Sequence, residues 1–443
     1  ENTWRNDAQE HERWTFSEPV GAAPEVDNCE TPLQFYELFF SEELLTMIAD
    51  QTNVYAQEKR RNWIQTDSDE LRIFFGLCMQ MSRCPFDNQR NYWSLKPRNL
   101  ARNGHSIAGD FMTRDRFEEI QRHLHFVDNS AAEKTNKLYK VQPVLDYLNS
   151  RFQAMYRPER ELCIDESMVP FRGRVSFWQY NGGKRHRFGI KLFKLCSRAG
   201  YTQKVKVYAG RDPKRTASVA EAVVLELMDG FLMQGRCLCT DNWYTSLPLA
   251  HTLLRKKTDM VGTIARNRKG IPQILRDKKL QRGEFIYQQN LKGVLVLKWR
   301  DKRDIHMMST KHDAEHIDEE ETVDKAMCHD LIMQPIATIE KYLITEHFSF
   351  EHMTLPSFVF YPTSCLGYIT TFVTIQVLTI QLRQWMKPIN GLHFHHQPSM
   401  LERSDSFMQQ VKESVVKDGA PTHKAAYSSF HESRNISQQA LDE

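Results

Sequence analysis

The spacing of hydrophobic positions changes near residue 157. Between residues 31 and 156, apolar residues recur every three or four positions in segments such as PLQFYELFF, SEELLTMIADQ and QPVLDYLNSRFQAMY. This spacing places them on one face of a helix. Ser41 directly precedes one such segment and fits an N-cap position. We expect an all-α N-terminal domain over residues 31–156, preceded by an acidic flexible arm over residues 1–30.

From residue 157 onward, β-rich segments alternate with two helical ones. The expected strands span residues 161–165, 187–198, 203–210, 236–241 and 259–266, and the expected helices span residues 218–231 and 246–257. An Ala-Gly turn between the second and third strands predicts a hairpin, and residues 283–310 have the pattern of an antiparallel meander. The order β-β-β-α-β-α-β indicates a mixed sheet with crossover helices.

These patterns predict an α+β multidomain protein. An α/β domain over residues 157–330, with a β-rich insertion at about 267–325, follows the helical domain. The composition then changes, because residues 331–400 contain only three acidic and three basic residues. We expect an atypical apolar segment over residues 331–403 and a polar, disordered tail over residues 404–443.

The uncharged stretch from His352 to Leu382 approaches the length of a membrane span. Its threonines, glutamines and β-branched residues favour a buried strand or an altered sequence over a membrane helix. We expect no membrane partner. The nine cysteines are scattered at irregular spacing without CxxC pairs, which favours a reducing compartment over a disulfide framework or a zinc module.

The net charge of +3 conceals a strong asymmetry. Residues 151–310 contain 32 Lys and Arg against 14 Asp and Glu, a charge of +18, which leaves −15 for the rest of the chain. A solvated basic face is one explanation. The persistence of the excess over such a long segment favours a polyanionic partner instead.

Two acids follow apolar runs at comparable places in the β-rich domain. Asp165 ends ELCID and Asp241 ends CLCTD. In a sheet of this order the first and fourth strands are neighbours, so both carboxylates should reach one edge and share a divalent cation. Asp165 could instead cap its strand, and Asp241 could initiate the NWYTS turn through its side chain. Glu166 is expected to be exposed on the opposite face from Asp165.

Basic and aromatic residues surround the first acid. Lys and Arg would hold a nucleic-acid backbone through its phosphates, and aromatic rings among them can stack on unpaired bases. The candidate DNA-binding residues are Arg172, Arg174, Lys184, Arg185, Arg187, Lys191, Trp178 and Tyr180.

The motifs IDESMVPFRGR, QYNGGKRHRFGIKLFKLC and TDNWYTS, with FMTRDRFEEIQRHLHF upstream, resemble those of piggyBac-type DNA transposases and proteins derived from them. The resemblance implies a ribonuclease-H-like catalytic domain with three metal-binding aspartates, and Mg²⁺ or Mn²⁺ as two bound ions. It implies a nuclear protein, a homodimer that cuts and rejoins transposon ends at TTAA targets. Asp165 matches the first aspartate and Asp241 the second.

The chain departs from this family after Asp330. The motif that should carry the third aspartate reads CHDLIMQPIATIEKY, and Glu340 is the acid near the catalytic place. The Cys-rich zinc-binding tail of the family is absent from the sequence given. The sequence therefore leaves two hypotheses, an active transposase completed by Glu340 and a domesticated derivative that binds DNA without catalysis. A frameshift or retained intron after Asp330 would explain the departure.

Overall fold

The structure is a computed structural model. It describes residues 3–5, 14–83, 86, 88–96, 108–130, 136–171, 175–182, 187–198, 200–210 and 218–312. The chain divides into two units, one formed by Glu1–Ser68 with Asp115–Met400 and the other by Asp69–Arg114 with Leu401–Glu443. Each is considered by itself.

The helices of the N-terminal region follow the expected spacing. In the larger unit they are α1 (Pro24–Asp27), α2 (Pro32–Glu37), α3 (Glu42–Lys59), α6 (Arg114–His123) and α7 (Gln142–Met155). The Ser41 side chain accepts a hydrogen bond from the Leu44 backbone N–H, which confirms its role as the N-cap of α3. An all-α domain with the bounds 31–156 remains a proposal.

The smaller unit holds most of α4 (Ser68–Arg83), with the 3₁₀ turns η1 (Gln89–Trp93) and η2 (Ala108–Asp110). Two aromatic side chains tie these pieces together. The Tyr92 hydroxyl donates to the Met81 carbonyl at 2.9 Å, and the Trp93 indole N–H donates to the Met112 carbonyl at 2.8 Å. The polar atoms of these two aromatic side chains therefore donate hydrogen bonds to backbone carbonyls, as Tyr and Trp usually do inside a protein.

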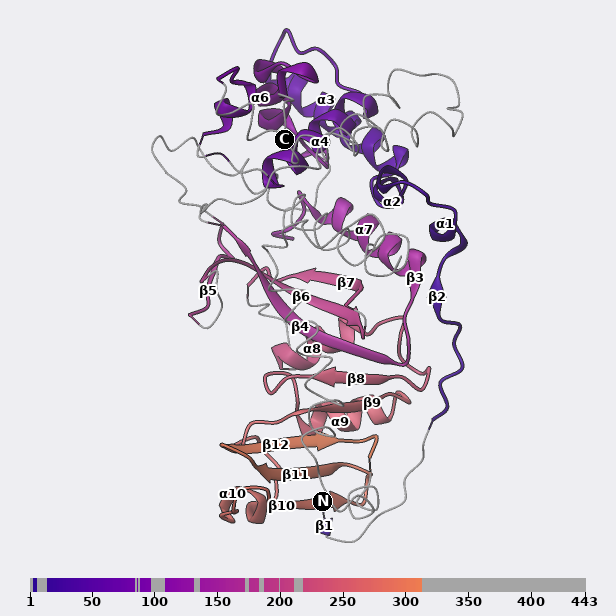
Figure 1. Ribbon diagram of the computed structural model, residues 1–443, viewed down its shortest axis with the longest axis vertical. Helices are drawn as coiled ribbons and strands as arrows, with labels where there is room; N and C mark the ends of the chain where they lie inside the picture. The colour runs from indigo at the N-terminus through magenta and orange to yellow at the C-terminus, as the bar shows by residue number, and fades with distance from the viewer. Residues whose placement is uncertain are drawn as a thin grey trace, which may run out of the picture. The chain divides into compact units, whose positions relative to one another are not determined.

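A mixed sheet lies at the centre of the larger unit (Figure 1). Its core strands are β4 (Glu161–Pro170), β6 (Phe188–Ser197), β7 (Thr202–Val207), β8 (Cys237–Thr240) and β9 (Asp259–Thr263). They lie in the order β7-β6-β4-β8-β9, with β4 parallel to β8 and β8 parallel to β9. The predicted order and the β6–β7 hairpin are confirmed.

The crossover helices α8 (Val219–Leu227) and α9 (Leu247–Leu254) cover one face of this sheet. Parallel neighbouring strands need such crossovers. A tight turn joins only antiparallel strands, so the chain must cross back to the starting edge of the sheet before the next parallel strand begins. The helices bury Val224 and Leu253 against Leu162, Leu238 and other strand residues in one hydrophobic core. On the other side of the core strands, α7 is tied to β7: the Asn149 side chain donates to the Val205 carbonyl and accepts from the Val205 N–H.

The predicted meander forms part of the same sheet. It consists of β10 (Phe285–Asn290), β11 (Leu295–Arg300) and β12 (Asp304–Ser309), preceded by the short helix α10 (Gln273–Asp277). β12 pairs antiparallel with β9, so the hydrogen-bonded ladder continues from the core strands into the meander. The described part of the insertion is thus an extension of the central sheet.

Part of the N-terminal arm is paired, where the polar composition suggested flexibility. β1 (Trp4–Arg5) lies against β10, and β2 (Gly21–Ala22) pairs with β3 (Tyr156–Arg157). The composition of the side chains does not show whether backbone N–H and C=O groups form hydrogen bonds. An exposed strand edge can pair with any extended segment.

One boundary differs from its prediction in a way that matters for the candidate site. The first strand was expected to end at Asp165, but β4 continues to Pro170. The reason is that β6 pairs with it along its whole length, from Leu162↔Ser197 to Pro170↔Gly189. The parallel partner β8 accompanies only the first part, from Glu161↔Cys237 to Ile164↔Thr240.

Gly262 permits the close approach of β9 to the end of β8. A Cβ atom there would stand 2.2 Å from the Thr240 carbonyl oxygen and 2.7 Å from the Thr245 hydroxyl oxygen. We expect Gly262→Ala to lower the free energy of unfolding by about 2 kcal/mol, because overpacking forces the backbone apart. Urea denaturation measures this. Gly182→Ala is the control, since its Cβ would make only ordinary contact at 3.4 Å, and equal stability of the two variants would contradict the prediction.

Candidate functional site

The two predicted acids follow the parallel ladder between β4 and β8. Ile164 lies opposite Thr240 as the last pair of this ladder; Asp165 is the next residue of β4, and Asp241 is the first residue after β8. One step earlier Cys163 lies opposite Cys239, and side chains two residues apart share a face of a strand. Asp165 therefore shares a face of β4 with Cys163, whereas Asp241 begins the turn after β8. The register confirms that the first and fourth expected strands are neighbours, and a cation site shared by the two acids stays a prediction.

Three buried thiols form a layer before the acids on this face. Cys163, Cys196 and Cys239 are each at most 2% exposed and make one cluster. Burial raises the pKa of the Cys196 thiol to about 11. The Cys196 thiol therefore remains protonated near neutral pH, and the three side chains act as small apolar packing groups.

Asp165 is almost enclosed, with 6% of its surface exposed. It lies directly opposite Lys194 of β6, whose side chain is fully buried. A buried carboxylate needs a compensating positive charge, and Lys194 is the cation at the facing position of the sheet. Lys194 was not among the residues predicted for the site. Its signal is a lysine within the apolar run LFKLC, where burial is to be expected on both faces.

Asp241 initiates the turn after β8. Its Oδ1 accepts from the Trp243 N–H at 3.0 Å and from the Tyr244 N–H at 3.4 Å. Arg268 holds the same turn by donating from Nη2 to the Asn242 and Trp243 carbonyls, at 2.5 and 2.8 Å. The turn-forming role considered from the sequence is thus observed. It fixes one carboxylate oxygen and with it the direction of the side chain.

The opposite face of β4 carries a second polar cluster, formed by Glu166, Lys191 and Tyr244. The Lys191 ammonium lies 3.4 Å from Glu166 Oε1, and the Tyr244 hydroxyl donates to Glu166 Oε2 at 3.2 Å. Lys191 Nζ also lies 4.8 Å and 4.7 Å from the ring centroids of Phe193 and Trp243. Alternation does separate Glu166 from Asp165, but the expectation that Glu166 is exposed is wrong: only 13% of its side chain is accessible.

The pKa of Tyr244 is affected by the carboxylates near the turn that follows β8. Burial raises its pKa well above the usual value, and three nearby carboxylates raise it further. They belong to Glu166, Asp165 and Asp241. Tyr244 therefore stays protonated and acts as a hydrogen-bond donor that links the turn after β8 to β4.

The remaining predicted residues divide into described and undescribed ones. Arg187 is exposed at the start of β6, and Trp178 and Tyr180 are exposed at and before β5 (Gln179–Tyr180). Lys191 is only 17% exposed and belongs to the Glu166 cluster. The predicted residues that lie outside the described ranges are Arg172, Arg174, Lys184, Arg185 and Glu340.

The donor set suits a hard divalent cation. Asp165 and Asp241 carry carboxylate oxygens, the ligands that Mg²⁺ and Mn²⁺ prefer, and each directly follows the last residue of the β4–β8 ladder. Among the described residues, no group of three or more His, Cys, Asp or Glu side chains is placed to hold a metal ion. A cation site at Asp165 and Asp241 is therefore a proposal.

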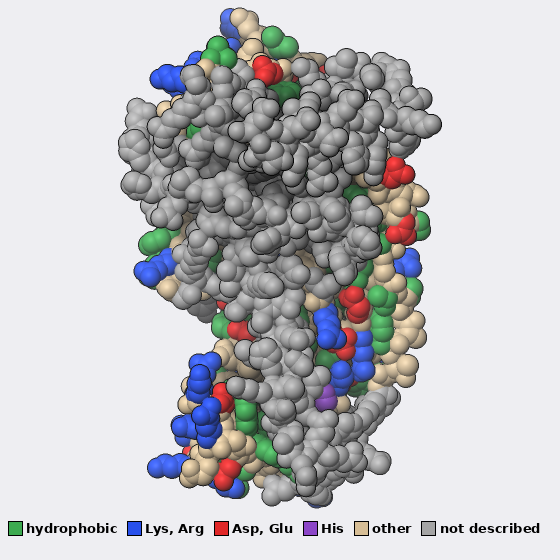
Figure 2. Space-filling view, viewed as in Figure 1, with side chains coloured by type: hydrophobic (Ala, Val, Ile, Leu, Met, Phe, Trp, Pro, Cys, Tyr) green, Lys and Arg blue, Asp and Glu red, His purple; other side chains and the backbone are tan. Residues whose placement is uncertain are grey.

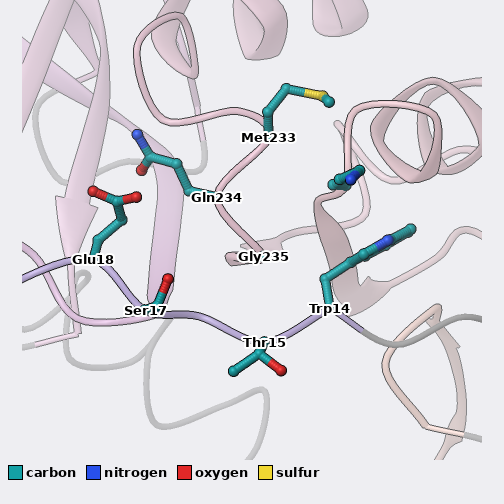
Figure 3. Close-up of a pocket in the computed structure, with 8 residues that line it drawn as sticks. Trp14, Thr15, Ser17, Glu18, Met233, Gln234 and Gly235 are labelled. Carbon is teal, nitrogen blue, oxygen red and sulfur yellow. The ribbon is translucent and has the colours of Figure 1, made fainter.

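A hollow of about 290 Å³ lies at the other end of β8 (Figure 3). It is lined by the arm residues Trp14, Thr15, Ser17 and Glu18, by Met233, Gln234 and Gly235, and by Lys257. Gly235 precedes β8, whereas Asp241 follows it. The Thr15 carbonyl would lie 2.7 Å from a Cβ at Gly235. The hollow therefore marks where the arm packs on the sheet, and it is separate from the acidic site.

No helix within the described residues is long and apolar enough to cross a membrane. The segment of residues 352–382, on which the membrane alternative depended, lies outside the described ranges.

Comparisons with known proteins agree with the motifs. A family model described as Transposase IS4 matches residues 31–344. The human piggyBac transposable element-derived protein 2 is 27% identical over 309 residues, which cover 67% of this chain and 51% of that protein. The human piggyBac transposable element-derived protein 3 is 27% identical over 290 residues, 63% of this chain and 48% of that protein. The chain spans about half the length of these relatives.

A solved structure shares the fold. It is the piggyBac transposase synaptic complex with hairpin DNA, with a TM-score of 0.67 and 22% sequence identity. The superposition covers 93% of this chain and 87% of that one. At this identity the likeness establishes the mixed α/β fold.

Lys191 and Arg187 were both predicted to bind DNA, and the structure gives them different surroundings. We expect Lys191→Ala to lower the free energy of unfolding by about 2 kcal/mol, since it removes contacts with two rings and leaves the half-buried Glu166 carboxylate without its cation. Arg187→Ala is the matched control, because an exposed side chain should change stability by less than about 0.5 kcal/mol. Chemical denaturation of both variants is the measurement, and a Lys191→Ala protein as stable as the control would refute the structural role.

Proposed function

This chain belongs to the piggyBac-type transposase family, and we propose that it acts on DNA as a metal-dependent transposase that cleaves and joins phosphodiester bonds at transposon ends. The observation that supports the proposal is the parallel β4–β8 register, whose last pair, Ile164 and Thr240, directly precedes Asp165 and Asp241. Two carboxylates in this position, within the segment of residues 151–310 with its charge of +18, suit chemistry on a polyanion.

The roles of the residues follow from their surroundings. Asp165 and Asp241 would hold Mg²⁺ or Mn²⁺, two ions in the complete site, with Glu340 as the proposed third acid. Bound there, the metal would activate a water or hydroxyl nucleophile and stabilise the leaving oxygen. Lys194 offsets the charge of Asp165 from the facing strand, and Arg268 and Tyr244 keep the Asp241 turn in place. Positioning of this kind limits the motion of a ligand carboxylate.

A basic surface on the loops that flank α10 would hold the DNA backbone. Figure 2 shows Lys and Arg side chains gathered on the side where α10 lies. The exposed ones in that segment are Arg266, Lys269, Lys278, Lys279 and Arg282. Together with Arg187 they would contact phosphates, which position DNA without reading its sequence. Transposon ends with TTAA targets as substrate, a homodimer as the active form and a nuclear location complete the proposal.

A domesticated derivative that binds DNA without catalysis is the second candidate. It is favoured by the sequence CHDLIMQPIATIEKY, in which the place of the third catalytic aspartate has only Glu340 nearby. The basic surface would be retained in such a protein and the metal-dependent reaction would be lost. Cleavage and binding assays therefore separate the two.

We expect Asp165→Asn and Asp241→Asn each to reduce Mg²⁺-dependent cleavage of a labelled transposon-end duplex at least about 100-fold. The basis is that even groups that merely support a metal ligand cost 10- to 100-fold when removed. Binding of the same duplex should change little, because Asn keeps the shape of Asp. Gel-resolved cleavage and fluorescence anisotropy measure the two quantities.

Glu161→Gln is the matched control, since Glu161 lies on the same strand and face as Asp165 but pairs with Lys311. Cleavage that survives in both aspartate variants would disprove the site. Binding without cleavage in the unmodified protein would establish the non-catalytic candidate.

A further inference from the structure

Three aromatic rings form a continuous exposed surface at the β5–β6 hairpin. Tyr180 lies directly opposite Phe188, with ring centroids 4.8 Å apart. Trp178, two residues before Tyr180, stacks on Phe188 at 5.2 Å with an angle of 21° between the planes. Residues two apart on a strand share a face, so all three rings lie on one side of the hairpin. Trp178, Tyr180 and Phe188 are called the three-ring surface below.

The exposure of these rings is unusual for this protein. Trp178, Tyr180 and Phe188 are 38%, 57% and 39% exposed. Among the large hydrophobic side chains of the described residues, they are the only aromatic ones that are exposed. Large rings bury much area when they can, and an exposed contiguous apolar patch commonly marks a binding surface.

The three-ring surface is held in place by the backbone. The Trp178 indole N–H donates to the Phe171 carbonyl at 3.1 Å, and the Asn181 N–H donates to the Arg187 carbonyl at 2.7 Å. Gly189, which follows Phe188, has no room for a side chain, because a Cβ would stand 2.0 Å from the Val169 carbonyl oxygen. The hairpin therefore lies tightly on β4, and the rings are fixed before any ligand arrives.

The charge around the three-ring surface selects an anionic partner. From Ser167 to Arg211 the sequence contains eleven Lys and Arg and no Asp or Glu. Arg187, directly before Phe188, is exposed. Figure 2 shows hydrophobic and basic side chains together at the edge where β5 lies. Aromatic faces combined with an excess of positive charge match the combination of base and phosphate in a single nucleic-acid strand.

We propose that the three-ring surface binds unpaired nucleobases of a DNA strand, with Phe188 as the central ring and Arg187 on the adjoining phosphate. The proposal rests on the proposed function and specifies which form of DNA this part of the protein takes. Bases in a duplex are stacked on one another and present only their edges. Bases freed from pairing expose both faces and can stack on protein rings irrespective of sequence.

The test compares DNA strands that differ only in their bases. Anisotropy measures the affinity of the full chain for a labelled duplex with a short unpaired thymidine tail, and for the same duplex with abasic residues in the tail. The two probes carry the same phosphates. The variant Phe188→Leu with Tyr180→Leu removes stacking and retains apolar bulk. Leu291→Ala, an exposed apolar position on the β10–β11 turn, is the control.

We expect the unmodified protein to bind the base-bearing tail about tenfold more tightly than the abasic tail, in keeping with the stacking contribution of one base. The leucine variant should lose this difference and bind the abasic probe as before, whereas Arg187→Gln should weaken both probes equally. Circular dichroism and the thermal midpoint establish that the variants are folded.

Equal affinity of the unmodified protein for both tails would overturn the proposal. An equal loss of affinity for both probes in the leucine variant would also overturn it. A leucine variant that changes only in oligomeric state, measured by light scattering, would assign the rings to contact with a second copy of the chain. The proposed function fails separately, if cleavage is absent or independent of Asp165 and Asp241 while the base-bearing tail is still preferred. Absence of binding to either probe would refute both.

Discussion

The site depends on one short parallel ladder, in which Glu161–Ile164 of β4 lies beside Cys237–Thr240 of β8. Parallel strands cannot be joined by a tight turn, so the chain must leave β7, pass through α8 and return to reach this position. The core formed by α8 and α9 against the strands supplies the apolar burial that keeps the ladder together. Asp165 and Asp241 each follow the last pair of this ladder, Ile164 and Thr240.

The two faces of β4 carry different groups, and in the proposed site one face would bind the cation while the other would hold the backbone. On one face the thiol layer of Cys163, Cys196 and Cys239 packs below the aspartates. On the other, Tyr244 and Lys191 hold Glu166, so that the turn carrying Asp241 is fastened to the strand carrying Asp165. A ligand pair must be held in a narrow range of geometries to bind a cation well, and fixing the backbone on the far side of the strand achieves this without crowding the site.

The spacing of hydrophobic residues predicted those features of the fold that neighbouring residues in the chain determine. The strand order, the β6–β7 hairpin and the placement of the two acids follow from hydrophobic runs and from the topology that such an order permits. The length of β4 could not be predicted, because it is set by pairing with a distant strand rather than by its own residues. Likewise Arg268 contacts a turn some 25 residues earlier in the chain, and nothing in its own segment signals this. Lys191 was assigned to DNA by its charge, whereas its surroundings are Glu166 and two rings.

The central claim is that Asp165 and Asp241 belong to one cation site, and iron-directed backbone cleavage tests it directly. Fe²⁺ can replace Mg²⁺ or Mn²⁺ at a carboxylate site, and with ascorbate and peroxide it cuts the polypeptide beside its ligands. Mapping the fragments by mass spectrometry should give cuts next to both Asp165 and Asp241, both suppressed by excess Mg²⁺. Cuts beside only one aspartate, or a pattern that Mg²⁺ leaves unchanged, would contradict the account.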